Sequence, residues 1–249
     1  MKNEIILWLS SAVIVFLIGY IKNVTDENYP VTGTFGIEGK KVSYKLDKIC
    51  FDKTAYKNLI ISDIKGVDAQ ILLLINGLQK NISYREIDRG LEAEIPISKL
   101  GEKIDYKLII NYKDKIFIIP KDGYINLTFW GNIPSPVRIF NFILMYGGML
   151  LSIRSLLESF TKKVNLKKFV FIICTVYLTL VIIIFPLYNT YKLGAINHFV
   201  PPITSLLNPF LIITLCVWII AAVLIFNKKY IRIVTVVAAS ATVLFYFLL

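Results

Sequence analysis

Residues 209–226, PFLIITLCVWIIAAVLIF, carry no charged side chain, and residues 231–249, IRIVTVVAASATVLFYFLL, carry only Arg232. Each run is about long enough to cross the roughly 30 Å hydrocarbon core of a bilayer as a helix. Inside hydrocarbon, backbone amides must find their hydrogen-bond partners within the segment, so such runs are helical. The two runs therefore predict a helical membrane protein and exclude a simple soluble enzyme.

Three further runs have the same character, which brings the expected number of transmembrane helices to about five. They cover Ile5–Ile21, Val137–Ile153 and Phe169–Phe185, where Pro186 is expected to end the helix. Residues 1–21 are interpreted as a retained anchor, because no small-x-small cleavage site follows the run; a cleaved signal peptide is the alternative. With 56% hydrophobic and 18% charged residues, the chain of 249 residues has the composition of this class.

The net charge of +11 lies beside the apolar runs. Residues 22–135 hold 17 basic and 15 acidic residues, so no basic domain face and no nucleic-acid partner are expected. The positive-inside rule places the more basic connections in the cytoplasm. That side carries Lys2, Arg154, Lys162, Lys163, Lys167, Lys168, Lys228, Lys229 and Arg232, and the other side carries only Arg138 and Lys192 outside the large domain. The N-terminus is therefore expected inside the cell, with residues 22–135 and the C-terminus external.

Between Val31 and Trp130 the pattern changes to the alternation typical of half-buried strands. The alternating apolar sets are Val42, Tyr44 and Leu46, then Tyr106, Leu108, Ile110 and Tyr112, then Ile125, Leu127 and Phe129. Turn signals occur at Glu38-Gly39, Asn76-Gly77, Lys113-Asp114-Lys115 and Asp122-Gly123. The run Ile71–Ile75 suits a central strand. About seven to nine short strands predict an all-β immunoglobulin-like sandwich, with a small barrel as the alternative.

The expected architecture is thus a membrane protein with an α-helical bundle and an inserted β-sandwich. Its parts are the anchor (1–21), an exported sandwich domain (22–135), and a four-helix transmembrane region (136–249) with an external segment (187–208).

Three stretches resemble a family of uncharacterised bacterial inner-membrane proteins. They are Gly33–Tyr44, Glu94–Ile97, and Met149–Arg154 with Leu157-Glu158. The resemblance covers about the first two-thirds of the chain and implies the same layout of anchor, periplasmic β-rich domain and helical tail. It implies no activity. After Pro186 this chain departs from the family, whose members carry a polar stretch rich in Trp, Asp and Asn before the fourth span.

The second transmembrane helix is expected to continue beyond the membrane as an amphipathic segment, Arg154–Lys168. This segment would lie along the inner leaflet, with Glu158 paired to Lys162. No ionisable residue is expected deep within a span, which argues against a proton-coupled carrier. Gly147, Gly148 and Ser152 supply small residues at helix-contact spacing, typical of a packing surface.

Catalytic motifs are absent from the sequence, and His198 is the only histidine, so no cofactor or metal site is expected. Asn208-Pro209 has the form of an N-cap followed by proline at the first helical position. The alternative is one helix from Ile203, kinked at Pro209. In either case Asn197, His198 and Asn208 are candidates for a small polar pocket at the outer face. The simpler alternative is that this segment is a structural loop at the membrane interface.

Three functional hypotheses follow. The first is a non-enzymatic membrane protein whose external sandwich binds a protein or envelope component. The second is a membrane enzyme or carrier acting on a lipid-like substrate at the outer face through Asn197, His198 and Asn208. The third is a passive channel built by a homo-oligomer. The expected partners are the lipid bilayer and a protein that contacts residues 22–135.

Overall fold

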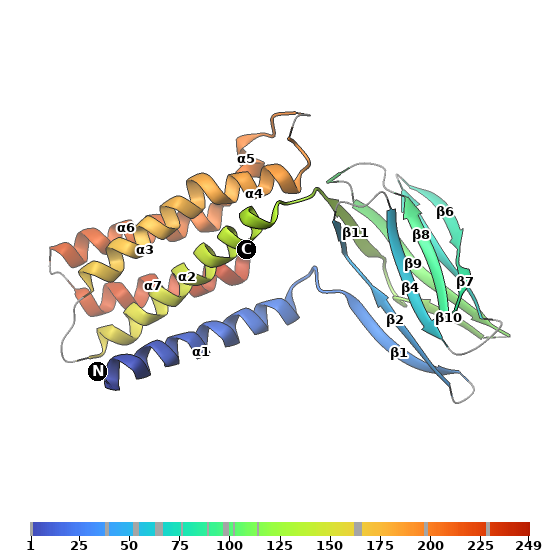
Figure 1. Cartoon of the computed structure of the whole chain (residues 1–249), viewed down its shortest axis with the longest axis horizontal. Helices are drawn as coiled ribbons and strands as arrows, with labels where there is room; N and C mark the ends of the chain where they lie inside the picture. The colour runs from blue at the N-terminus through green and yellow to red at the C-terminus, as the bar shows by residue number, and fades with distance from the viewer. Residues whose placement is uncertain are drawn as a thin grey trace. The chain divides into compact units, whose positions relative to one another are not determined.

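The chain forms two compact units, each described separately (Figure 1). The computed structural model describes residues 2–37, 40–51, 55–62, 67–75, 77–88, 90–96, 100–101, 103–113, 115–161, 166–196, 199–227 and 230–249. Asp26–Asn132 make up the β unit, and Met1–Thr25 with Ile133–Leu249 make up the helical unit.

The five apolar runs are all helical, as expected. The helices are α1 (Lys2–Thr25), α2 (Ser135–Ser159), α3 (Lys167–Thr179), α4 (Phe185–Lys192), α5 (Ile203–Leu206), α6 (Pro209–Phe226) and α7 (Ile231–Leu248), with a π-helical turn η1 (Leu180–Ile184) joining α3 to α4. Within the described residues, five helical stretches are long and apolar enough to cross a membrane, counting α3, η1 and α4 as one.

The third span does not stop at Pro186, and that expectation was wrong. The helix runs through the proline to Lys192 because a π turn precedes it. Within this turn the Phe185 amide bonds to the Leu180 carbonyl, five residues back. A proline removes one amide donor and crowds the carbonyl four residues before it, here that of Ile182 inside η1. The wider turn accommodates this, so the expected external segment 187–208 begins as helix.

Helices α1, α3 and α7 pack around α2 and α6. Helix α2 contacts α1, α3 and α7, and α6 contacts α3 and α7 (Figure 1). Gly148 lies against Tyr177 of α3, as expected for a packing surface, since an added Cβ would stand 3.0 Å from the Tyr177 Cζ. Gly147 has no such neighbour and instead lines a groove of about 610 Å³ between α1 and α2. Polar contacts also join the helices, among them Trp218 Nε1 to Thr242 Oγ1 at 2.8 Å and the Tyr146 and Tyr246 hydroxyls at 2.8 Å.

The β unit consists of two sheets. The first has the order β1 (Val31–Ile37), β2 (Lys40–Leu46), β4 (Ala55–Ser62), β8 (Gly90–Pro96) and β7 (Arg85–Ile87). The second has the order β3 (Ile49–Phe51), β11 (Ile125–Trp130), β9 (Lys103–Tyr112), β5 (Asp68–Ile75) and β6 (Leu78–Ser83), with β10 (Lys115–Ile119) also paired to β9. All pairs are antiparallel except β3 with β11.

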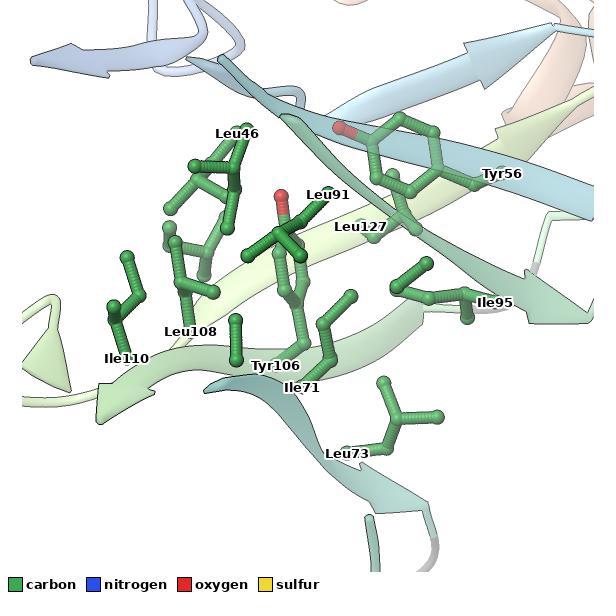
Figure 2. Packing of buried hydrophobic residues seen from close by; sticks show 14 of the residues in the cluster. Leu46, Tyr56, Ile71, Leu73, Leu91, Ile95, Tyr106, Leu108, Ile110 and Leu127 are labelled. Atoms are coloured by element: carbon green, nitrogen blue, oxygen red, sulfur yellow. The ribbon is translucent and has the colours of Figure 1, made fainter. Parts of the chain in front are cut away.

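One apolar core lies between these sheets, and the alternating residues fill it. Figure 2 shows Leu46 and Tyr56 of the first sheet gathered with Ile71, Tyr106 and Leu127 of the second. The buried positions of β9 and β11 are those that the alternation predicted. The central position of β5 is also confirmed, but only its alternate residues are buried. The described residues form eleven strands, more than the seven to nine expected, partly because two three-residue strands give no alternation signal.

Candidate functional site

Of the three residues predicted to line an outer-face pocket, the structure describes only Asn208. Asn197 and His198 lie outside the described residues, so their relation to Asn208 stays a prediction. Asn208 is the N-cap of α6, as expected: its Oδ1 accepts hydrogen bonds from the amides of Phe210 at 2.8 Å and Leu211 at 3.3 Å. The single kinked helix from Ile203 is not formed, because Leu207 and Asn208 are extended. The Asn208 oxygen therefore has a structural role.

An ionisable residue lies buried inside the second span, contrary to expectation. Arg154 is only 3% exposed within α2, and its Nη1 lies 2.6 Å from Glu158 Oε2. The helix ends at Ser159. In the structure Glu158 pairs with Arg154. Its expected partner, Lys162, lies outside the described residues.

Two aromatic rings from other helices enclose the Arg154 guanidinium. Its central carbon lies 5.6 Å from the ring centre of Trp8 in α1 and 5.2 Å from that of Phe169 in α3. A cation over an aromatic face is attracted by the ring quadrupole, and more strongly where water is excluded. Arg154 Nε has no hydrogen-bond partner among the described residues. The group therefore joins α1, α2 and α3, and the sequence pattern of α2 alone could not reveal this.

The two outer faces of the β unit differ in polarity. On the first sheet, Arg85 of β7 donates to Glu92 of β8, and Lys57 of β4 lies 3.9 Å from the same carboxylate. The hydrogen bond from Arg85 holds the pKa of Glu92 below its usual range. Charged cross-strand pairs of this kind are ordinary on a solvated sheet.

The second sheet gathers apolar side chains on part of its outer face. We call Leu72, Leu74, Ile109, Ile116 and Ile118 the outer patch. The strand register sets Ile118 directly opposite Ile109, while Leu72 faces Lys107, two residues along β9 from Ile109. Ile116 is 67% exposed and Ile118 43% exposed. Exposed apolar side chains that cluster in this way are typical of interaction surfaces.

Sequence reasoning missed the outer patch, although two signals were present. The run Ile71–Ile75 predicts a central strand, and because it is apolar at every position it also places Leu72 and Leu74 on the face away from the core, where they are half-buried. The run Ile116–Ile119 is apolar at every position, so it departs from alternation and places isoleucines on the outer face.

The core of the β unit contains a polar network. Asn58 is 1% exposed; its Nδ2 donates to the Lys45 carbonyl at 2.8 Å and the Tyr56 hydroxyl at 3.0 Å, and its Oδ1 accepts from the Tyr84 hydroxyl. The Tyr106 hydroxyl donates to the Asp47 carbonyl at 2.8 Å. Burial raises the pKa of Tyr56, Tyr84 and Tyr106, the buried tyrosines. Buried neutral phenols bonded in this way hold a core together.

Within the described ranges, no group of three or more His, Cys, Asp or Glu side chains is placed to hold a metal ion. No family model, no curated protein and no solved structure matches this chain. The resemblance to the bacterial inner-membrane family therefore stays an expectation from the quoted residues.

Proposed function

We propose that this chain is a non-enzymatic integral membrane protein whose external sandwich binds a protein through the outer patch. The observation that carries the proposal is the polarity difference between the two outer faces. The first sheet exposes Leu59 and Ile87 on separate strands among its charged pairs, whereas the second sheet exposes Ile116 and Ile118 on one strand, with Ile109 directly opposite Ile118.

The strand order supports an immunoglobulin-like fold for this domain. The order β2–β4–β8–β7 corresponds to the ABED sheet of that fold, and β5–β9–β11 corresponds to its CFG sheet. The outer patch then lies on the CFG side. The additional strands β1, β3, β6 and β10 lengthen the two sheets without changing this order.

The proposed location is the inner membrane of a bacterium, with the domain on the outer side. The support comes from the basic connections between spans, nine basic residues on one side against two on the other. The five apolar helices provide the anchor and an assembly surface.

The test is crosslinked affinity purification of the full-length chain from its native membranes, comparing matched charge substitutions. Ile116→Glu and Ile118→Glu place a carboxylate in the outer patch, and Leu59→Glu, at a residue 49% exposed on β4, places one on the opposite face. We expect a stoichiometric protein that is recovered with the wild type and Leu59→Glu but lost with Ile116→Glu. Equal recovery with all variants, or no partner with the wild type, would overturn the proposal.

A further inference from the structure

A second site on the same sheet lies in a polar cavity of about 450 Å³ within the β unit. Asn126 and Thr128 of β11 line it together with Lys103 of β9, which stands directly opposite Thr128 in the strand register. Ile125 at the start of β11 also lines it. The other lining residues come from the start of the β unit, including Glu27 and Asn28, from Lys48 between β2 and β3, and from the segment between β10 and β11, including Asp122 and Tyr124.

Local hydrogen bonds fix the segments around this cavity. Lys48 Nζ donates to the Glu27 carbonyl at 2.7 Å, and the Lys48 carbonyl accepts from the Thr128 amide at 2.9 Å. The Asn28 amide bonds to Asp26 Oδ1 at 2.7 Å, which closes a turn next to the cavity. These bonds hold the Lys48 side chain and the backbone at Asn28 and Thr128 in place before any ligand arrives, which lowers the entropic cost of binding.

The lining is polar and carries no net charge. Eight of its eleven residues have polar side chains, with Lys48 and Lys103 balanced by Glu27 and Asp122. Among the residues that the structure describes, none of these four forms an ion pair with another. Most small-molecule sites are instead lined mainly by apolar side chains. A ligand for this cavity needs many hydrogen-bond donors and acceptors and little charge.

Saccharide hydroxyls have this chemistry. Each hydroxyl can donate and accept, and the amides of Asn28 and Asn126 and the hydroxyl of Thr128 can do the same. Tyr124 adds a half-buried aromatic ring to the lining. Lys107 Nζ lies over this ring, 4.5 Å from its centre. A ligand with a net charge of either sign would meet two side chains of like charge, Glu27 and Asp122 for an anion, so the balanced lining favours a neutral ligand over phosphate or a polyanion.

We propose that this cavity binds a neutral saccharide of one or two rings. Its volume lies within the range of about 300–1,000 Å³ that ligand sites occupy. The inference rests on the proposed function in one respect, the external position of the domain, where envelope saccharides are found. Binding itself is measured on the purified chain and does not depend on the outer patch.

The experiment uses the full chain in nanodiscs of phosphatidylethanolamine and phosphatidylglycerol, because alkyl glycoside detergents carry sugar headgroups that would compete. Saturation-transfer NMR and calorimetry report binding of maltose and N,N′-diacetylchitobiose, with glucose 6-phosphate as the charged probe. We expect saturable binding of at least one neutral disaccharide. Asn126→Leu should weaken it by about tenfold or more, since the substitution removes the amide and leaves the ligand hydroxyls that it paired without a partner.

Matched variants separate this proposal from the protein-binding one. Asn81→Ala, at an exposed residue of β6 outside the cavity, and Ile116→Glu should both leave saccharide binding unchanged. Asn126→Leu should leave recovery of the protein partner unchanged. No saturable binding of either disaccharide up to about 10 mM would overturn the inference. So would stronger binding of glucose 6-phosphate, or undiminished binding by a folded Asn126→Leu variant.

Discussion

Replacing Asn58 by alanine should strongly destabilise the β unit while leaving the helical unit intact. Asn58 is buried between the sheets and makes three hydrogen bonds, two as donor and one as acceptor. The substitution removes all three and leaves the Lys45 carbonyl and the Tyr84 hydroxyl without this partner. It also removes buried volume from a closely packed core.

The magnitude follows from these contacts. A typical hydrogen bond contributes about 1 kcal/mol net, and a buried partner left unpaired costs about 1–3 kcal/mol. Asn58→Ala should therefore lower the free energy of unfolding by about 3–5 kcal/mol, a large share of the 5–15 kcal/mol usual for a domain. Tyr84→Phe removes a single one of these bonds and should cost about 1–2 kcal/mol.

Pulse proteolysis in urea measures this on the full chain in nanodiscs, where cleavage within residues 26–132 reports unfolding of the β unit alone. With a denaturant dependence of about 1–3 kcal/mol per molar urea, the Asn58→Ala midpoint should fall by about 1–5 M. Asn81→Ala, on an exposed strand, should leave the midpoint unchanged. A loss below about 1 kcal/mol for Asn58→Ala, or equal losses for Asn58→Ala and Tyr84→Phe, would refute the reasoning.

Three further predictions concern packing, charge and pH. Gly148→Ala should lower the thermal midpoint in detergent, at a cost of about 1–3 kcal/mol, because its Cβ would crowd Tyr177. Gly147→Ala should be nearly neutral, and equal effects would contradict the packing argument. Glu158→Ala should lower the free energy of unfolding by about 3–5 kcal/mol, since it leaves the Arg154 charge buried without its counterion. The double variant Arg154→Met with Glu158→Leu should recover most of the thermal midpoint. No recovery would count against the explanation. Burial raises the folded-state pKa of the buried tyrosines above the unfolded value near 10. The neutral phenols therefore contribute their full share of the folding stability below about pH 10. Above it, stability should fall by up to about 1.4 kcal/mol per pH unit for each tyrosine, so an unchanged urea midpoint from pH 9 to pH 11 would disprove this.

Local patterns predicted the elements of this fold well. Charge-free runs identified the five apolar helices, and alternation identified which residues of β9 and β11 face the core. The Asn208-Pro209 cap was also visible, because capping depends only on residues within one turn. These features share one property: the interactions that decide them act between residues close together in the chain.

Features that depend on distant residues could not be predicted in this way. Arg154 stands near the end of an apolar run, where the pattern suggests a position facing headgroups. Its burial comes from Trp8 and Phe169, which belong to two other helices. The outer patch likewise exists only once β5, β9 and β10 pair in register, and the candidate saccharide cavity only once β9 and β11 meet the segment at Glu27.

The π turn before Pro186 makes the third span sensitive to chain length. A π turn holds one residue more than an α turn, so deleting one residue within Leu180–Ile184 would leave an α turn in which the Pro186 ring clashes with the carbonyl four residues before it and kinks α4 away from its present direction. Asn189, whose Nδ2 now reaches the carbonyls of Ser205 at 3.2 Å and Leu206 at 3.1 Å, would face another direction. A one-residue deletion here should therefore disturb α5 more than most substitutions in the same turn, and insertions and deletions at this site should be rare among sequences that keep the α4–α5 contact.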